Sequence, residues 1–336
     1  MRQLRTARYG DEIMNDSPLL VLTAPGDKNI PLLPELRQMA TILVEDSARD
    51  FARAAVDPEI ILNWSGSLAL LREVFLMLCR VRWIHSRSAG LEQTLFPELI
   101  ESEVILTNGS GVFSPSLGEF ALAAILYFAK DFRRMIRNQM AGVWEQFDVT
   151  MVSGQTLGIV GYGSIGRAVA ARAHALEMNV LGLRRRVAHQ TKEDPVIDQV
   201  YGSEQRLEML SRCDYIVVTA PLTERTRGLI ADAEFAVMKK NAVIINIGRG
   251  PTIDERAMIK ALSENRIRGA ALDVFDQEPL PQGHPFYSLE NVLLSPHCAD
   301  HTPDWLDNAM RLFLTQLGRF GRGETLLNIV DKTLGY

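Results

Sequence analysis

The sequence predicts an α/β protein of two domains, each a doubly wound parallel sheet with helices on both faces. Two observations predict this class. The chain has 336 residues, which is too long for one typical domain. Short buried apolar runs alternate with helical patterns along both halves, as in βαβ units.

The composition is that of an ordinary globular protein, with 47% hydrophobic and 23% charged residues. A net charge of −5 argues against a nucleic-acid surface. No apolar run reaches the roughly 20 residues that span a membrane. The cysteines Cys79, Cys213 and Cys298 indicate neither a disulfide framework nor a metal site, so we expect no metal and a reducing, cytoplasmic compartment.

The first half alternates strands and helices after a basic N-terminus. Arg2, Arg5 and Arg8 precede no apolar signal core, so we interpret this stretch as a leader or tag remnant, with a cleaved transit peptide as the alternative. Ser47 is the expected cap of a helix that ends near Val56. The other expected elements are strands 19–24, 41–44, 59–64, 82–85 and 104–107 and a helix over 67–79.

A long helical pattern over 116–144, interrupted near Gly142, opens the second half. Its first part is apolar on most faces, which predicts burial, either against a second subunit or in its own core. Asp254 is the expected cap of a helix over 254–264, and the last helix, 303–320, is expected to return to the first domain. The expected strands are 157–160, 178–183, 215–219, 242–246, 268–272 and 292–294.

The stretch Leu157-Gly158-Ile159-Val160-Gly161-Tyr162-Gly163-Ser164-Ile165-Gly166 is a strand, a glycine turn and a helix start. Gly161 permits the tight turn, Gly163 lets a diphosphate approach the backbone, and Gly166 lets the helix pack on the strand. The first helical N–H groups, including those of Ser164 and Ile165, would bind the phosphates. An ordinary βα turn explains one glycine more easily than three, so we predict a dinucleotide site.

The next strand ends in Arg184-Arg185-Arg186, 23 residues after Gly161 (184 − 161 = 23). Sites specific for NAD place an acidic residue near this position to hold the ribose hydroxyls. Arginine instead pairs with a 2′-phosphate. We therefore predict NADP, with NAD possible, and Arg184 and then Arg185 as the phosphate ligands; a basic surface run is the alternative.

Four later loops follow strands of the second half, so they should converge at the carboxyl edge of its sheet. They contain Asn246-Ile247-Gly248-Arg249-Gly250, Asp273-Val274-Phe275-Asp276-Gln277-Glu278-Pro279-Leu280, Ser295-Pro296-His297 and Thr219-Ala220-Pro221. With the glycine turn, this ordered set resembles the D-isomer-specific 2-hydroxyacid dehydrogenases from Pro18 to Phe320. The resemblance implies a Rossmann coenzyme domain (111–298) inserted into a flavodoxin-like substrate domain (1–110 and 299–336).

The resemblance also implies that Arg249, Glu278 and His297 form a catalytic trio. A guanidinium can grip both the carboxylate and the carbonyl oxygen of a 2-oxo acid. A protonated imidazole can donate the proton that the reduced oxygen needs, and a carboxylate on its other nitrogen would orient it. Glutamine stands at the Glu278 position in the related formate dehydrogenases, so glutamate favours 2-oxo acid chemistry. Each residue alone would more often be structural; together they favour catalysis.

By the same resemblance, Thr219, Pro221, Ile247 and Asp273 contact the cofactor, Asp273 at the nicotinamide carboxamide. The loop Arg87-Ser88-Ala89-Gly90 looks like the substrate loop, with the N–H groups of Ala89 and Gly90 at the substrate carboxylate. Arg87 is less typical; it could favour a second anionic or hydroxyl group, or be a solvated arginine. Trp64 and Ser65 are further candidates for this pocket.

The leading hypothesis is an NADPH-dependent reductase of glyoxylate or hydroxypyruvate, a homodimer by family habit. A 3-phosphoglycerate dehydrogenase-type enzyme is the first alternative. A nucleotide-sensing protein like the corepressors of this family is the second. Asp300-His301-Thr302 replaces the glycine-rich turn of many relatives, which leaves the substrate open, and we expect His301 to be a bystander or a helix cap.

Overall fold

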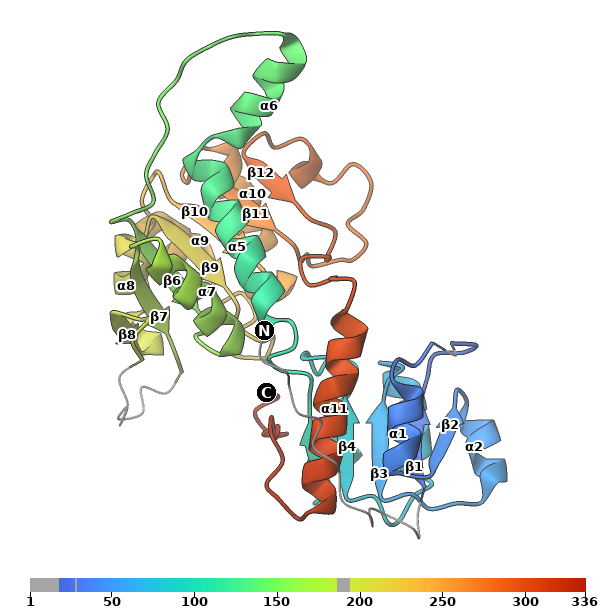
Figure 1. Ribbon diagram of the computed structural model, residues 1–336. Helices are drawn as coiled ribbons and strands as arrows, with labels where there is room; N and C mark the ends of the chain where they lie inside the picture. The colour runs from blue at the N-terminus through green and yellow to red at the C-terminus, as the bar shows by residue number, and fades with distance from the viewer. Residues whose placement is uncertain (1–17, 28, 186–193) are drawn as a thin grey trace, which may run out of the picture. The chain divides into compact units, whose positions relative to one another are not determined.

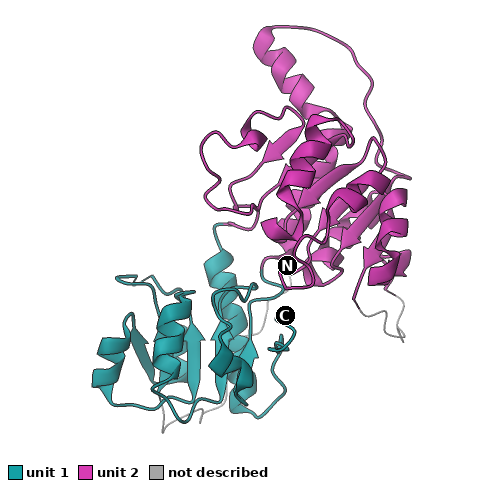
Figure 2. Ribbon diagram, turned by 180° about the vertical axis from the view of Figure 1, so that it is seen from behind, with its two compact units in different colours: residues 1–112, 303–336 teal, residues 113–302 magenta. Residues whose placement is uncertain are grey.

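The computed structural model describes residues 18–27, 29–185 and 194–336. The chain divides into two compact units, residues 1–112 with 303–336 (unit 1) and residues 113–302 (unit 2), as Figure 2 shows. The sequence placed these junctions at 110/111 and 298/299. The expected leader and Arg186 lie outside the described residues.

Unit 1 contains a five-stranded parallel sheet of order β2-β1-β3-β4-β5 (Figure 1). Because the chain starts inside the sheet and reverses direction between β1 and β3, this is the flavodoxin-like order. The strands are β1 (Leu19–Leu22), β2 (Ile42–Glu45), β3 (Ile60–Asn63), β4 (Trp83–Ser86) and β5 (Ile105–Thr107). The expected fold class of this unit is confirmed.

Helices cover both faces of the unit 1 sheet. One apolar cluster joins the sheet to α1 (Leu33–Met39) and α11 (Trp305–Gly321), with Phe313 at its centre. The other joins it to α2 (Ala48–Ala54), α3 (Leu68–Phe75) and α4 (Pro97–Glu101). Ser47 caps α2 as expected, since its side chain accepts a hydrogen bond from the Asp50 N–H. α3 ends at Phe75, four residues before the expected end at Cys79 (79 − 75 = 4).

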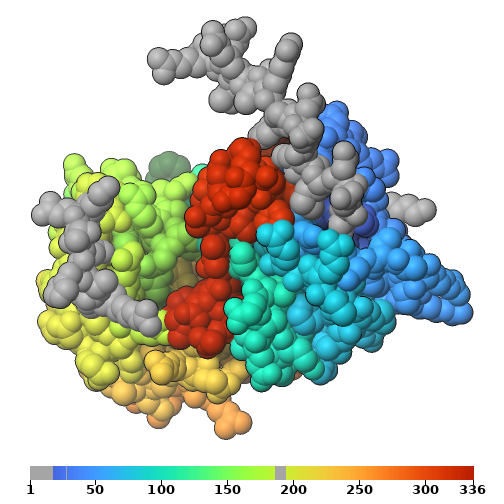
Figure 3. Space-filling model, turned by 90° about the horizontal axis from the view of Figure 1, so that it is seen from below, coloured from blue at the N-terminus to red at the C-terminus, as the bar shows by residue number. Residues whose placement is uncertain are grey.

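The last residues of the chain return to the edge of this sheet. Figure 3 shows them (red) beside the segment that leads into β5 (cyan to green). Lys332 donates hydrogen bonds to the carbonyl oxygens of Leu99, Ser102 and Val104. Ile329 forms an antiparallel bridge with Thr107. The C-terminal segment is therefore part of the structure of unit 1.

Unit 2 contains a seven-stranded parallel sheet of order β12-β11-β10-β9-β6-β7-β8. Counted from β6, this is the Rossmann order, extended by one strand, and the order reverses between β6 and β9. The strands are β6 (Thr156–Val160), β7 (Asn179–Leu183), β8 (Gln199–Tyr201), β9 (Tyr215–Val218), β10 (Val243–Asn246), β11 (Gly269–Leu272) and β12 (Val292–Leu294). The sequence did not predict β8, a three-residue edge strand with only Tyr201 buried.

Helices again cover both faces. α5 (Ser114–Ala129) and α7 (Ser164–Ala175) pack on one face, and α8 (Arg206–Arg212), α9 (Asp232–Val237) and α10 (Glu255–Ser263) pack on the other. Asp254 caps α10 as expected, because its carboxylate accepts from the Ala257 N–H at 2.8 Å. α5 is buried in the core of its own unit, one of the two possibilities that its apolar faces left open.

The prediction of one helix as far as Trp144 was wrong. α5 ends at Ala129, and α6 (Phe132–Ala141) begins after Asp131, whose φ of 51° breaks the helical path. The Asp131 side chain caps α6 by accepting from the Arg134 N–H. Gly142, the expected interruption, ends α6 in the left-handed conformation. No helix among the described residues is long and apolar enough to span a membrane.

Candidate active site

The glycine turn joins β6 to α7 at the point where the strand order of unit 2 reverses. Gly161 has a φ of 97°, and a Cβ there would lie 2.6 Å from the Ala220 backbone. A Cβ on Gly166 would lie 2.9 Å from Ile159 on the strand. A Cβ on Gly163 would meet nothing within 4 Å, which leaves its backbone open to a ligand. The three glycines thus fit the roles that a dinucleotide site requires.

The loop after β9 lies against this turn. Thr219 donates a hydrogen bond from Oγ1 to the Gly161 carbonyl oxygen at 2.7 Å. Pro221 accepts one from Thr226 Oγ1 at 2.6 Å, which fixes the rest of the loop. A Cβ on Gly248 would lie 3.0 Å from the Ala220 oxygen, so the loop after β10, with the buried Ile247, adjoins the same place. The expected convergence of these loops is present.

Arg184 is fixed to the glycine turn. Its Nε donates to the Tyr162 carbonyl oxygen at 2.8 Å, and its guanidinium lies 4.7 Å from the Tyr162 ring centre. The Tyr162 hydroxyl and Arg167 Nε both donate to Asp194 Oδ2, at 2.9 and 3.0 Å. Burial first, and then the bond to Asp194, raises the pKa of the Tyr162 hydroxyl. Sequence reasoning missed this Tyr162–Arg167–Asp194 group, because Asp194 lies in an irregular segment without a motif.

Arg249 lies in a loop shaped by its neighbours. Asn246 donates to the Arg249 carbonyl oxygen at 3.0 Å and accepts from the Gly248 N–H at 3.1 Å. Thr252 donates to the same Arg249 oxygen at 2.6 Å. The guanidinium donates from Nη1 to the Gly248 oxygen at 2.7 Å. The Asn-x-x-Arg-Gly motif is therefore a hydrogen-bonded turn that sets the direction of Arg249.

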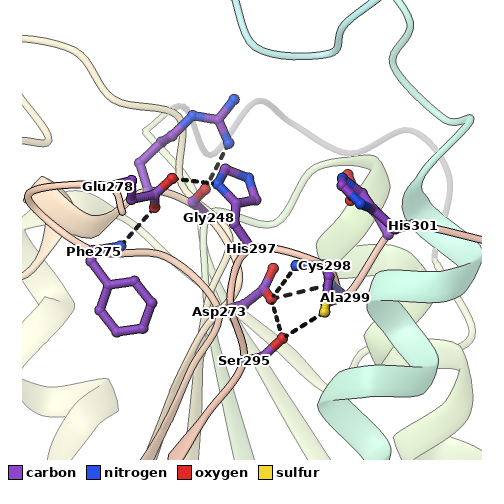
Figure 4. Close-up of polar contacts among 11 residues, drawn as sticks. Gly248, Asp273, Phe275, Glu278, Ser295, His297, Cys298, Ala299 and His301 are labelled. Atoms are coloured by element: carbon purple, nitrogen blue, oxygen red, sulfur yellow. Dashed lines mark hydrogen bonds and ion pairs between the residues drawn. The ribbon is translucent and has the colours of Figure 1, made fainter. Parts of the chain in front are cut away.

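The Arg249 loop contacts the loop that holds Glu278. A Cβ on Gly250 would lie 2.0 Å from the Phe275 carbonyl carbon, so only glycine fits there. The Phe275 N–H donates to Glu278 Oε1 at 2.9 Å. Glu278 Oε2 lies 2.6 Å from His297 Nδ1, the pair at the centre of Figure 4. The structure thus places His297 and Glu278 in contact and the Arg249 loop against theirs.

Asp273 holds the histidine loop. Its Oδ1 accepts from Ser295 Oγ at 2.5 Å and from the N–H groups of Cys298 and Ala299 at 3.0 and 3.1 Å (Figure 4). His297 itself has a φ of 52°, a left-handed conformation that costs a histidine of order 1 kcal/mol or more. Asp273, which is 1% exposed, stabilises that conformation. Asp273 was expected to bind the nicotinamide carboxamide, and its Oδ1 already accepts hydrogen bonds from within the protein.

The segment after the histidine turns away from this pair. His301 Nε2 lies 3.8 Å from Asp300 Oδ1, and the His301 side chain is 61% exposed. In Figure 4 His301 stands apart from His297 and Glu278. Burial raises the pKa of the Asp300 carboxyl. Within the described residues, no group of three or more His, Cys, Asp or Glu side chains could hold a metal.

The predicted substrate loop lies in unit 1, directly after β4. Asn108 Nδ2 donates to the Ala89 oxygen at 2.8 Å, and the Gly109 N–H donates to the Ser88 oxygen at 3.1 Å. Within the described residues, the N–H groups of Ser88, Ala89 and Gly90 donate no hydrogen bond. The Ser88 and Ala89 carbonyl groups are thus bound, and among the described residues the three N–H groups remain available.

A glycine turn at the switch point of a parallel sheet, with a histidine–carboxylate pair in the same unit, defines the class of nicotinamide-dependent oxidoreductases. The family model "D-isomer specific 2-hydroxyacid dehydrogenase, NAD binding domain" matches residues 122–299. The chain belongs to this family of D-isomer-specific 2-hydroxyacid dehydrogenases and is an NAD(P)-dependent oxidoreductase, as the sequence predicted.

Individual relatives agree with this assignment. The glyoxylate/hydroxypyruvate reductase B of Enterobacter sp. (strain 638) is 35% identical over 303 residues, which cover 86% of this chain and 90% of the relative. The D-3-phosphoglycerate dehydrogenase of Methanocaldococcus jannaschii is 31% identical, over 82% of this chain but only 52% of its own length.

A solved structure agrees as well. The D-isomer specific 2-hydroxyacid dehydrogenase of Xanthobacter autotrophicus Py2, in complex with NADPH and MES, is 26% identical and superposes with a TM-score of 0.80 over 96% of this chain and all of that one.

Proposed function

We propose that this protein reduces a small 2-oxo acid of the glyoxylate or hydroxypyruvate type to the D-2-hydroxy acid, with NADPH as the reductant. When bound, the reduced nicotinamide supplies a hydride, which adds to C2 as the carbonyl π bond breaks. His297 donates a proton from Nε2 to the carbonyl oxygen, because its Nδ1 faces Glu278. The observation that carries this proposal is the 2.6 Å contact of His297 with Glu278 in a loop held by Asp273.

The other residues bind and orient. Arg249 binds the substrate carboxylate and polarises the carbonyl group, and Glu278 orients the imidazole of His297. Among the described residues the N–H groups of Ser88, Ala89 and Gly90 donate no hydrogen bond, and they would donate to a substrate carboxylate. Gly161, Gly163, Ser164, Ile165 and Gly166 would hold the diphosphate. Thr219, Pro221, Ile247 and Asp273 would complete the cofactor site.

Arg184 and Arg185 are the proposed ligands of the 2′-phosphate, which favours NADPH over NADH. Arg184 uses Nε for the Tyr162 oxygen, and within the described residues its terminal nitrogens make no hydrogen bond or ion pair. A phosphate could therefore meet two donors whose position the Tyr162 ring fixes.

A rate panel tests the proposal. Glyoxylate, hydroxypyruvate, pyruvate and 3-phosphohydroxypyruvate are each reduced with NADPH and with NADH, by the wild type and by Arg184→Gln. We expect glyoxylate or hydroxypyruvate to give the highest kcat/KM, and Arg184→Gln to raise the KM for NADPH about 10-fold or more with little change for NADH.

Two outcomes would replace the proposal. A preference for 3-phosphohydroxypyruvate would favour a 3-phosphoglycerate dehydrogenase-type enzyme. Tight dinucleotide binding without turnover would favour a nucleotide-sensing protein. Equal efficiency with NADH and NADPH would contradict the assignment of the arginines.

We also propose a homodimer in a reducing, cytoplasmic setting. α6 projects from the rest of unit 2 (Figure 1), and none of its residues is buried. Met140 and Trp144 are 85% and 95% exposed, and Phe132, Ile136 and Met151 add to this apolar surface. Exposed apolar side chains of this kind on a projecting helix are typical of a protein–protein interface. A molar mass in solution near twice 37.5 kDa is the expected result.

A further inference from the structure

A positively charged side chain lies between aromatic rings at the carboxyl edge of the unit 1 sheet. The Arg87 guanidinium carbon is 5.0 Å from the Trp64 ring centre and 5.3 Å from that of Trp305. Trp64 follows β3, Arg87 follows β4, and Trp305 begins α11. Both distances are within cation–π range, so two indole rings hold the guanidinium in place.

This cation has no counter-ion in the part of the chain that the structure describes. No carboxylate there lies within 4.0 Å of Arg87, and its Nε is buried without a hydrogen-bond partner. Burial lowers the pKa of Arg87, against the smaller opposing effect of the Asp27 charge. A partly buried guanidinium without an anion is costly, since its solvation is lost and nothing replaces it.

Two neighbouring side chains also hold unmet donors. Trp64 is 1% exposed and Asn63 is fully buried, and neither Trp64 Nε1 nor Asn63 Nδ2 has an acceptor within the described part of the chain. The side-chain oxygen Oδ1 of Asn63 is already occupied, because it accepts a hydrogen bond from Ser65 Oγ at 3.0 Å. The donors of Asn63 and Trp64 thus lie near the Arg87 guanidinium. This combination of donors and positive charge favours a ligand with negatively charged acceptor oxygens.

The backbone at Arg87 packs closely against two neighbouring segments. A Cβ on Gly109 would lie 2.3 Å from the Arg87 carbonyl oxygen, so the two segments are in close contact. The Arg87 N–H donates to the backbone carbonyl oxygen of Asn63 at 3.3 Å, and this hydrogen bond joins the ends of β3 and β4. The strand order of this sheet reverses between β1 and β3, and ligands of such sheets bind at that point, beside Trp64.

From these contacts we propose that Arg87, clamped by Trp64 and Trp305, forms an oxyanion subsite for a second anionic group, a carboxylate or a phosphate, on the 2-oxo acid substrate. A guanidinium with fixed orientation presents a planar fork of donors to such a group. The subsite raises kcat/KM for a 2-oxo acid with two anionic groups above the value that the same acid would have without Arg87, while glyoxylate and hydroxypyruvate stay the preferred substrates. This inference rests on the proposed function and adds a second, dianionic class of substrate to it.

Arg87→Met tests the subsite, and the same substitution at Arg82 is the matched control. Arg82 also stacks on a ring, 5.2 Å from the Phe320 centre, but it is exposed and paired with Glu59 at 3.1 Å. The measured quantity is kcat/KM for oxaloacetate and for 3-phosphohydroxypyruvate, each divided by that for glyoxylate. We expect Arg87→Met to lower one or both ratios about 10-fold or more, Arg87→Lys to restore part of the loss, and Arg82→Met to leave activity and ratios unchanged.

The two arms identify the anion. A loss confined to oxaloacetate assigns a carboxylate subsite, and a loss confined to 3-phosphohydroxypyruvate assigns a phosphate subsite. Unchanged ratios in Arg87→Met would overturn the inference.

A binding measurement separates this inference from the proposed function. Malonate, inorganic phosphate and acetate are titrated against tryptophan fluorescence, since two tryptophans flank Arg87. We expect malonate or phosphate to bind more tightly than acetate, and Arg87→Met to remove the difference. If no 2-oxo acid is reduced but this binding depends on Arg87, the reductase proposal fails and the subsite stands. If glyoxylate is reduced but neither dianion binds better than acetate, the subsite fails and the reductase stands.

Discussion

The loops at the carboxyl edges of the two sheets use their polar groups in opposite ways. Around His297 in unit 2, the side chains are paired within the protein: Glu278 bonds both the histidine and the Phe275 N–H, and Asp273 accepts three donors. Around Arg87 in unit 1, Nε and the donors of Trp64 and Asn63 have no hydrogen-bond partner among the residues that the structure describes.

The difference separates preorganisation from recognition. A proton donor must stand in its reactive position before the substrate arrives, so the protein fixes it with its own hydrogen bonds. A binding group gains most when its partner is the ligand, since donors left unmet in the free protein are satisfied only in the complex. Unit 2 shows the first arrangement and unit 1 the second.

Gly250→Ala should break the unit 2 arrangement most severely. The new methyl group would lie 2.0 Å from the Phe275 backbone and push the Arg249 loop away from the Glu278 loop. We expect kcat/KM for glyoxylate to fall about 100-fold or more, as for a displacement near 1 Å of a catalytic group. Gly142→Ala, at an open helix end with a φ of 65°, is the control and should cost stability but not activity. Unimpaired catalysis in Gly250→Ala would contradict this account of the site.

Glu278→Gln tests how far catalysis depends on the paired groups around His297, because it removes one charge and changes the side-chain volume little. Glu278 Oε2 holds the His297 ring at Nδ1, and the uncharged amide makes a weaker hydrogen bond, so the ring should be less well oriented for proton transfer. We expect kcat near neutral pH to fall about 10- to 100-fold. The matched control is Glu255→Gln, because Glu255 lies 3.0 Å from His284 Nε2 in a similar pair outside the site. An unchanged kcat in Glu278→Gln would exclude the proposed role.

His85→Gln should have the smallest effect and concerns the core of unit 1. Burial lowers the pKa of His85 to about 3, and its Nδ1 lies 2.7 Å from Thr107 Oγ1. The folded state thus keeps this histidine neutral, while the unfolded chain takes up a proton below its usual pKa near 6.5. Stability from this group is present above pH 6.5 and is lost, by at most about 1.4 kcal/mol per pH unit, as the pH falls towards 3.

The glutamine variant should therefore be less stable than the wild type at pH 7, with a gap that narrows at pH 5. The measurement is the Tm of both proteins at the two pH values. A constant gap would show that His85 does not titrate on unfolding.

The features that could be predicted from the sequence are those that depend on residues close together in the chain. Strand and helix periodicity predicted both sheets, and the glycine turn predicted the β6–α7 junction, because each depends on neighbours in the chain. Ser47 and Asp254 cap their helices for the same reason. The break at Asp131 was missed, since aspartate in a left-handed conformation leaves no signal comparable to glycine.

The contacts that could not be predicted join residues that are far apart in the sequence. Trp305 reaches Arg87 only because the C-terminal helix returns to unit 1, and no local pattern joins residues so far apart. Asp273 was expected as a cofactor ligand; its bonds to the histidine turn depend on two loops meeting in space. Motifs identify which residues matter, whereas the assembled fold determines which of them already have partners.

The final stretch of the chain has a consequence for biosynthesis. Ile329 forms a bridge with Thr107, and Lys332 donates to the carbonyl oxygens of Leu99 and Val104 before β5, so unit 1 needs residues that are synthesised after all of unit 2. The central half has all its strands much earlier and can acquire its structure during translation. A nascent chain arrested before α11 should therefore resist protease over 113–302 while the N-terminal strands remain open to digestion.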